Sequence, residues 1–424
     1  MLLVWLGCLV CCRESRPATT PSGERSPATP GDAAPTGTDP AGAGPTATSG
    51  TASTPEALLT VATPEWRLAA NPVAVGRGAE LAGRFECNRC HDLPGPPAHP
   101  DKACVGCHQR ILRGEFQGAS PEAVADWKRN IVHLTAVPSL RTLDRRVRRD
   151  WIARYLLTPT DQRPRLAASM PRLPMTADQA ESIAAFLAPS AVPDEPALGD
   201  ASAGEAAWTL GGCAACHGEP DADAPAQKYA ATQIALAPDL RNLREKYHTA
   251  GLIAWLESPT GYMPAIPTDA PAVAAYLMAR TPPAPPTRTV PPRLPVLERR
   301  VRYKEIEDRL FLAMCWHCHS EPDLARGDGG PGNSGGFGFR GVGLSLASYA
   351  ATASGSLDET GRRQSIFRKG ADGTPQLVAV LRARQMEEAG QWDPTITGMP
   401  LGLPAISPED LQLVESWVAQ GRPQ

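Results

Sequence analysis

Apolar residues recur at helical spacing in short segments of the chain, and long stretches rich in Pro and Gly separate these segments. The spacing predicts amphipathic helices. Three of them end similar parts of the sequence, namely Ala177–Ala188, Asp269–Arg280 and Ser407–Gln420. Signals for strands are weak. The pattern therefore predicts a mainly α protein built from several small helical domains.

Residues 1–12 form an uncharged apolar run that contains Cys8, Cys11 and Cys12 at its end. The run is too short to cross a bilayer, which takes roughly 20 residues, but it has the length of the apolar part of a signal peptide. A cysteine there resembles the lipidation site of a bacterial lipoprotein. Lipid attachment, a cleaved signal and a short retained anchor remain open. Each predicts export, to the periplasm or the outer face of the cytoplasmic membrane.

Residues 13–63 are predicted to be a disordered tether rich in Pro, Ser, Thr, Ala and Gly. Between Arg13 and Pro55 there is no aromatic residue and no aliphatic residue larger than Ala. Such a segment has too little apolar surface to offset the entropy lost on ordering. Behind an anchoring cysteine, this tether would let the folded part range over a membrane surface.

Composition narrows the class of the remaining chain. Hydrophobic residues make up 42% of the sequence, which allows packed cores, while 45 Pro and 38 Gly predict loops and linkers. The formal net charge is -3. Since nucleic-acid-binding proteins carry basic patches, no nucleic-acid partner is expected.

The cysteines beyond residue 12 fall into four copies of the pattern C-x-x-C-H. Two thiols three residues apart reach the two vinyl groups of one haem, and the His that follows binds the iron. Zinc ribbons do not require that His. The pattern predicts four covalently attached c-type haems. The attachment residues are Cys87, Cys90, Cys104, Cys107, Cys213, Cys216, Cys315 and Cys318, and the proximal iron ligands are His91, His108, His217 and His319.

Three methionines are candidates for the opposite side of the iron: Met170, Met263 and Met399. Each is followed by Pro and lies shortly before one of the three final amphipathic segments. A methionine as sixth ligand fills the coordination sphere and raises the reduction potential. The sequence therefore predicts iron centres that exchange electrons.

At this point the chain resembles the class I cytochrome c family. That family has a first helix, C-x-x-C-H, a Pro-x-Leu turn, a middle helix, an axial Met and a last helix that crosses the first. Here Gly204 lies nine residues before Cys213, and Pro238-Asp239-Leu240, Met263 and the last amphipathic segment follow. A second copy of the order starts at Gly78. A third, ending at Met399, has a Gly-rich insertion and no evident Pro-x-Leu.

The resemblance implies tandem class I cytochrome c-like helical domains, the first carrying an inserted second haem. Pro-rich segments set the boundaries. The predicted parts are a signal- or lipoprotein-like segment (1–12), the tether (13–63), a dihaem domain (64–189), a linker (190–199), a monohaem domain (200–281), a Pro-rich linker (282–297) and a second monohaem domain (298–424).

The motif at Cys104 is the unusual one. Only 12 residues separate it from His91, too few for a separate cytochrome fold. The favoured pairing puts Met170 on the iron of His91, and the opposite pairing with His108 stays open. For the leftover iron the favoured ligand is His133. His99, Met175 and an open five-coordinate iron are the alternatives.

Two further features have simpler interpretations. The basic run of Arg145, Arg146, Arg148 and Arg149 is predicted to be a solvated helix face, with a docking patch or a partner for haem propionates as the alternative. His248 competes with Met263 for the third iron, but Met263 holds the position that the family uses.

The predicted function is electron transfer between a redox donor and a redox acceptor in a respiratory chain. Filled coordination spheres favour a carrier over an enzyme, and no other catalytic constellation is evident in the sequence. The alternative is a haem enzyme, a peroxidase or an oxidoreductase of small sulfur or nitrogen species, in which one open haem is fed by the others. A third possibility is an electron-transfer subunit of a larger respiratory complex.

Overall fold

The structure is a computed structural model of the chain. It describes residues 64–96, 103–117, 120–131, 135–160, 162–163, 166, 170–217, 234–240, 243–259, 263–266, 268–280, 288–316, 318–319, 343–358, 360–393 and 395–424. By its contacts the chain divides into Met1–Thr60 and Val61–Gln424, and all described residues belong to the second of these. The predictions for residues 1–12 and 13–63 lie outside the described residues.

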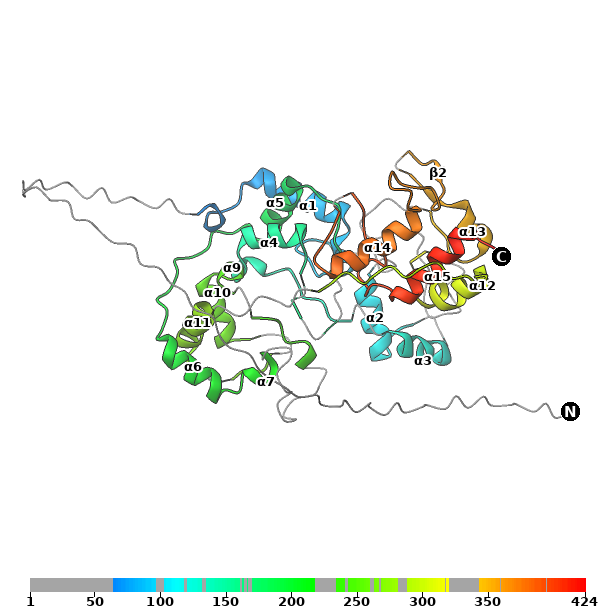
Figure 1. The fold of residues 1–424 in the computed structure, drawn as a ribbon. Helices are drawn as coiled ribbons and strands as arrows, with labels where there is room; N and C mark the ends of the chain where they lie inside the picture. Colours follow the sequence, from blue (N-terminus) through cyan, green and yellow to red (C-terminus); the bar gives the residue numbers. More distant parts are fainter. Residues whose placement is uncertain are drawn as a thin grey trace, which may run out of the picture. The chain divides into compact units, whose positions relative to one another are not determined.

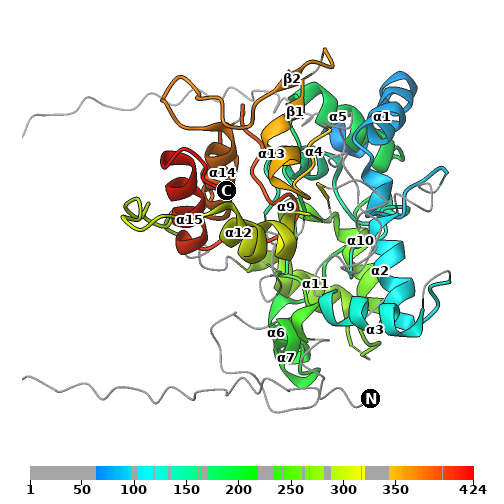
Figure 2. The ribbon, with the colours of Figure 1, turned by 90° about the vertical axis from the view of Figure 1, so that its right-hand side faces the viewer.

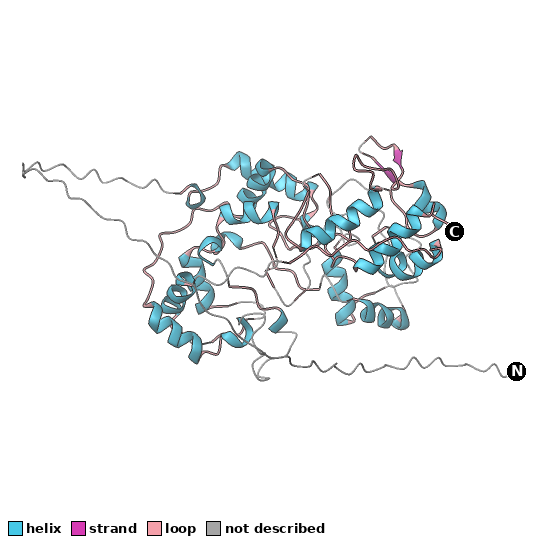
Figure 3. Cartoon of the chain, viewed as in Figure 1, coloured by secondary structure: helices cyan, strands magenta, loops and turns pink. Residues whose placement is uncertain are grey.

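The described residues are mainly helical, as predicted (Figure 3). The helices of the first half are η1 (Glu65–Arg67), α1 (Pro72–Arg84), η2 (Cys87–Arg89), α2 (Cys104–Arg113), α3 (Pro121–Asn130), η4 (Leu143–Arg145), α4 (Arg149–Leu157), α5 (Ala177–Leu187), α6 (Ala201–Leu210) and α7 (Ala214–His217). Those of the second half are α9 (Leu243–Lys246), α10 (Thr249–Glu257), α11 (Ala270–Ala279), α12 (Tyr303–Ile306), the π-helix η5 (Glu307–Cys315), α13 (Tyr349–Ser354), α14 (Gln376–Glu388) and α15 (Pro408–Ala419). A short antiparallel pair, β1 (Ser356–Leu357) and β2 (Arg363–Gln364), is the one sheet in the described ranges.

Within the described ranges, buried side chains gather into three hydrophobic cores. They draw on residues 81–188, 208–278 and 301–417. We call the surrounding regions the Cys87 module, the Cys213 module and the Cys315 module, after the cysteine that packs against each core. The exact domain boundaries remain predictions. No helix in the described part of the chain is both long enough and apolar enough to span a membrane.

In the first two modules the first and last helices pack on each other, α1 on α5 and α6 on α11 (Figures 1 and 2). Each crossing takes place at a glycine. A Cβ on Gly78 would lie 1.9 Å from the carbonyl oxygen of Ser182, and one on Gly204 would lie 2.0 Å from that of Ala272. Contact this close between helix backbones is possible only without a side chain. In the Cys315 module the equivalent spacing before the cysteine holds Ile306, which is fully buried.

Caps at the helix starts explain why the predicted segments begin where they do. Thr176 and Gln179 form a reciprocal capping box at α5, Asp269 accepts the N–H of Ala272 at α11, and Ser407 accepts the N–H of Asp410 at α15. Each cap satisfies backbone donors that the first turn leaves open. The three predicted final helices are confirmed, each starting directly after its cap.

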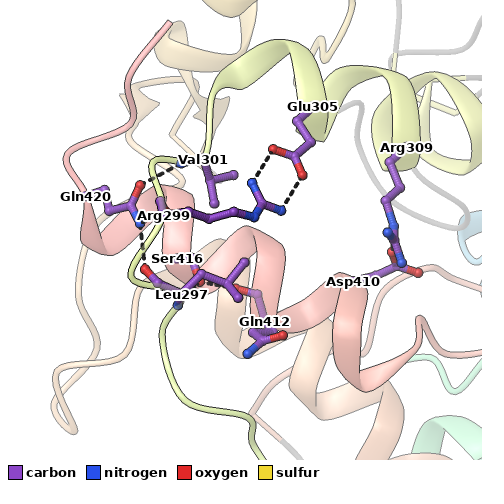
Figure 4. Close-up of polar contacts among 9 residues, drawn as sticks. All are labelled: Leu297, Arg299, Val301, Glu305, Arg309, Asp410, Gln412, Ser416 and Gln420. Carbon is purple, nitrogen blue, oxygen red and sulfur yellow. Dashed lines mark hydrogen bonds and ion pairs between the residues drawn. The ribbon is translucent and has the colours of Figure 1, made fainter.

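The described end of the predicted Pro-rich linker, residues 288–297, contains neither helix nor strand, and Leu297 at its end is hydrogen-bonded to α15 and to the residue that ends it (Figure 4). The N–H of Leu297 donates to Ser416 Oγ (2.9 Å). Gln420 accepts the N–H of Val301 (2.8 Å) and donates to the carbonyl of Leu297 (2.9 Å). We call residues 291–301 the strap. Its bonds to α15 hold it against the Cys315 module.

Candidate haem sites

The four C-x-x-C-H motifs lie at or beside helix ends. Cys87 opens η2, Cys104 opens α2, Cys213 directly precedes α7, and Cys315 ends η5. All eight motif cysteines are free thiols and half-buried. Burial raises the pKa of Cys87 to about 11 and that of Cys315 to about 12, because a buried thiolate loses its hydration.

The predicted proximal histidines of the first two modules are held in the same way. Nδ1 of His91 bonds the carbonyl oxygen of Pro138 at 2.9 Å, and Nδ1 of His217 bonds that of Pro238 at 3.1 Å. A carbonyl accepts, so Nδ1 carries the proton in each ring and the lone pair lies on Nε2. Burial lowers the pKa of His91, which favours the neutral ring. Both prolines belong to the Pro-x-Leu elements recognised in the sequence.

His319 of the Cys315 module is held differently. Burial lowers its pKa to about 4, and a hydrogen bond to the backbone of Leu344 opposes the shift. Nδ1 of His319 is buried and has no hydrogen-bond partner among the described residues that meets the usual geometry. The backbone around it is fixed instead, since the carbonyl of His319 accepts the N–H of Leu346 at 2.6 Å. Burial rather than a proline carbonyl keeps this ring neutral.

Each hydrophobic core brings one motif cysteine and one predicted axial methionine together. Met170 packs on the core that Cys87 contacts, Met263 on that of Cys213, and Met399 on that of Cys315. Met175 also packs on the first core, as expected for a core methionine. The shared core of Met170 and Cys87 favours the pairing of Met170 with His91 over the pairing with His108.

The second motif lies on a separate helix pair. Phe116 and Trp127 pack edge to face between α2 and α3, with ring centroids 5.2 Å apart, beside the buried Ile111. Cys107 bonds Arg110, which partly offsets the rise in its pKa caused by burial. His133 and His99, the candidate ligands for this motif, lie outside the described residues.

Three motifs come close to one another. Burial raises the pKa of Cys90 to about 12, and the neighbouring Cys104 and Cys318 add to the rise through their charges. The ion pair of Arg89 with Glu86 (2.5 Å) lies among them, because Arg89 also acts on Cys104 and Cys318. The sequence did not predict that the Cys315 motif lies near the Cys87 and Cys104 motifs, because no local pattern indicates such a contact.

The prediction of a solvated face at residues 145–149 is wrong for most of the run. Arg146 lies over the ring of Trp255 at 4.2 Å and Arg148 over that of Trp66 at 4.3 Å. Arg149 donates to backbone carbonyls of the chain before α1. Arg146 and Arg148 thus contact aromatic rings from other parts of the chain, which the local sequence does not indicate.

His248 is buried and caps α10. Its Nδ1 accepts the N–H of Gly251 at 3.0 Å, and its Nε2 lies 3.3 Å from the carbonyl oxygen of Asp144. Both ring nitrogens are thus engaged, which favours Met263 over His248 as the axial ligand. Met263 has a contact of its own, because the indole N–H of Trp255 donates to its sulfur at 3.3 Å.

Among the described residues, no group of three or more His, Cys, Asp or Glu side chains gathers at a point where it could hold a metal ion. Comparison with family models, curated proteins and solved structures found no match to this chain.

Proposed function

We propose that the protein is a tetrahaem c-type cytochrome that transfers electrons between redox partners. The observation that carries the proposal is the repeated pairing of a C-x-x-C-H cysteine and a Met-Pro methionine on one hydrophobic core, at Cys87, Cys213 and Cys315. Covalently bound haem supplies the one-electron couple between ferrous and ferric iron.

The donor atoms of the chain fit this cofactor. The Nδ1 bonds of His91 and His217 place the lone pair of each neutral ring on Nε2, the atom that would bind iron, and three half-buried methionine sulfurs are the complementary soft ligands. Nε of Arg110 is one of the buried guanidinium nitrogens that have no hydrogen-bond partner among the described residues. A buried donor of this kind suits a carboxylate, and haem carries two of them.

The helix order supports tandem class I cytochrome c-like domains. In the Cys213 module it runs α6, the motif, Pro238, α10, Met263 and α11, and α6 crosses α11 at Gly204. The Cys87 module repeats this order and its glycine crossing at Gly78. We assign the extra motif at Cys104 to a haem inserted in the loop after His91.

An electron carrier needs coordination spheres that are filled and stay filled. Met170, Met263 and Met399 provide the sixth ligand in three modules, and the surrounding cores exclude water. Covalent haem attachment requires export, which agrees with the apolar run at residues 1–12. We therefore place the protein in the periplasm or on the outer face of the cytoplasmic membrane, with redox proteins as donor and acceptor.

A second candidate function is that of a haem enzyme with its open iron at His108. The observation that favours it is the position of α2, which packs with α3 rather than on a core that holds a Met-Pro methionine. An iron there would lack the methionine that the other three have, and an open iron binds small molecules.

The test is the haem content and the ferrous CO spectrum of the exported full chain. We expect four covalent haems, falling to three in the variant Cys104→Ala/Cys107→Ala, and no CO adduct. Met170→Ala should change the spectrum of one haem, while the matched variant Met175→Ala leaves all four unchanged. A chain without covalent haem contradicts the proposal, and a CO-binding haem with peroxidase turnover that Cys104→Ala/Cys107→Ala abolishes selects the enzyme.

A further inference from the structure

The junction of the Cys87 and Cys213 modules is built from two matching segments. The N–H of Arg148 donates to the carbonyl of Lys246 at 2.8 Å, and the N–H of His248 donates to that of Arg146 at 3.1 Å. Between them Val147 and Tyr247 form an antiparallel bridge. The two bonds are reciprocal, so each module presents the residues before its middle helix, α4 or α10, to the other.

A glycine brings the modules into close contact at this junction. A Cβ on Gly251 would lie 2.3 Å from the Cα of Arg146. This approach places the guanidinium of Arg146 over the indole of Trp255, 4.2 Å from its centroid. Nε of Arg146 is buried and has no hydrogen-bond partner among the described residues. The contact puts a positive charge on the face of the Trp255 ring.

The same indole reaches the predicted axial ligand. Nε1 of Trp255 donates to Sδ of Met263 at 3.3 Å. A thioether sulfur is a weak acceptor, so the strength of this bond depends on how strongly the N–H is polarised. The contacts form a continuous line from a cation of one module to a sulfur of the next.

We infer that Arg146 of the Cys87 module sets the reduction potential of the haem of the Cys213 module through Trp255 and Met263. The inference rests on the proposed function, since it concerns the sulfur that would bind the iron of His217. It makes Arg146 and Trp255 positioning residues for an electron-transfer centre, and it couples that centre to the neighbouring module.

The expected sign follows from charge. A cation over the ring draws electron density from the indole and makes the N–H a stronger donor. A stronger bond to Sδ of Met263 reduces the electron density that the sulfur gives to iron, which favours the ferrous state. The positive charge itself acts in the same direction. Removing either Arg146 or Trp255 should therefore lower the potential.

The equivalent contact on the other side of the junction, that of Lys246 with Trp151, is not connected to a methionine sulfur by a described hydrogen bond. Lys246 lies over Trp151 at a longer distance, 4.8 Å, and Trp151 stacks on Tyr155. The two middle helices thus carry a similar cation–aromatic contact, but the described hydrogen bond from an indole to an axial methionine belongs to Trp255.

The experiment is a redox titration of the full haem-loaded chain, followed by visible and EPR spectra. The haem of the Cys213 module is identified as the one whose signal changes in Met263→Ala. We expect Arg146→Gln to lower the midpoint potential of this haem and to leave the other three potentials unchanged. Arg146→Lys, which keeps the positive charge, should have a potential close to that of the unmodified protein. Trp255→Phe should lower the potential by itself. In the Trp255→Phe background, Arg146→Gln should have a much smaller effect.

The control is Arg148→Gln, which removes the same charge from the junction but leaves Trp255 untouched. An equal shift in Arg148→Gln, an unchanged potential in Arg146→Gln, or a full Arg146→Gln effect without the indole N–H each overturns the inference. The redox titration is interpreted only for protein that carries four covalent haems. A chain that attaches no haem overturns the proposed function together with the inference, whereas four haems with unchanged potentials overturn the inference alone.

Discussion

The Cys213 module and the Cys315 module solve the same packing problem with opposite residues. In the first, α6 crosses α11 at Gly204, where the backbone of α11 occupies the place of a side chain. In the second, the same spacing before the cysteine holds Ile306, whose fully buried side chain fills the core under α15. The first module has no space for a side chain at this position, whereas the core of the second is filled by one.

The two modules also differ in how they hold the proximal histidine. His217 bonds the carbonyl of Pro238. His319 has no well-aligned acceptor and depends on burial, while the strap fastens the helix that closes its core. The comparison indicates that burial alone can favour the neutral ring where no proline carbonyl accepts the N–H.

The largest loss of stability is expected from shortening the buried side chain of Ile306 in the Cys315 module. Ile306→Ala should destabilise the Cys315 module by about 3 kcal/mol, because it deletes buried methylenes and leaves a cavity. Hydrogen exchange of the amides in α15 would measure the loss. Leu312→Ala, on the exposed side of the same helix segment, is the control and should change exchange little. Equal exchange in the two variants would mean that Ile306 does not organise this core.

The opposite substitution should be harmful in the second module. Gly204→Ala places a Cβ 2.0 Å from the carbonyl oxygen of Ala272, and separating α6 from α11 should cost about 2 kcal/mol. Gly76→Ala is a matched control within α1, since a Cβ there meets nothing within 4 Å. It should stabilise the helix by up to about 1 kcal/mol. Gly204→Ala should thus lower the unfolding temperature and Gly76→Ala should raise it. If both variants shift it in the same direction, the close contact of α6 and α11 at Gly204 is refuted.

The strap should contribute less than either core residue. Gln420→Ala removes bonds to Val301, Leu297 and Arg299 and should cost about 1 to 2 kcal/mol, because Val301 is buried and its N–H loses its acceptor. Gln412→Ala removes an exposed bond to Pro295 and should cost less than about 0.5 kcal/mol. Protease sensitivity of residues 291–301 measures both. Similar sensitivity in the two variants would show that the strap is not held by Gln420.

The sequence was sufficient where the signal is local. The spacing of apolar residues and the caps at Thr176, Asp269 and Ser407 predicted the final helices closely. The shared distance from Gly78 and Gly204 to a cysteine marked two similar helix crossings, and the C-x-x-C-H spacing predicts the attachment cysteines.

Contacts between distant segments could not be predicted in this way. Arg146 and Trp255 lie about a hundred residues apart, and nothing in either local sequence indicates that they stack. The strap is a similar case, because its prolines predict an extended chain but not what binds it. The approach of Cys318 to Cys90 depends on how whole modules pack, which hydrophobic periodicity does not specify.

The smallest expected effect concerns His248, which distinguishes the Cys213 module by capping α10, whereas the equivalent Arg148 gives α4 no side-chain cap. Burial lowers the pKa of His248, with the backbone of Asp144 and the charge of Glu195 opposing the shift and Arg67 adding to it. Protonation would also remove the acceptor for the N–H of Gly251 and put a positive charge at a helix N-terminus.

Because the unfolded chain binds this proton more readily than the folded one, the contribution of His248 is complete above about pH 6.5 and is lost as the pH falls below that value. Between pH 7 and pH 6 the loss is at most about 0.7 kcal/mol. His248→Asn keeps a capping side chain but cannot titrate. Urea unfolding followed at α10 by hydrogen exchange should therefore show a weaker pH dependence in the variant, and the same dependence in both proteins would assign the effect to other groups.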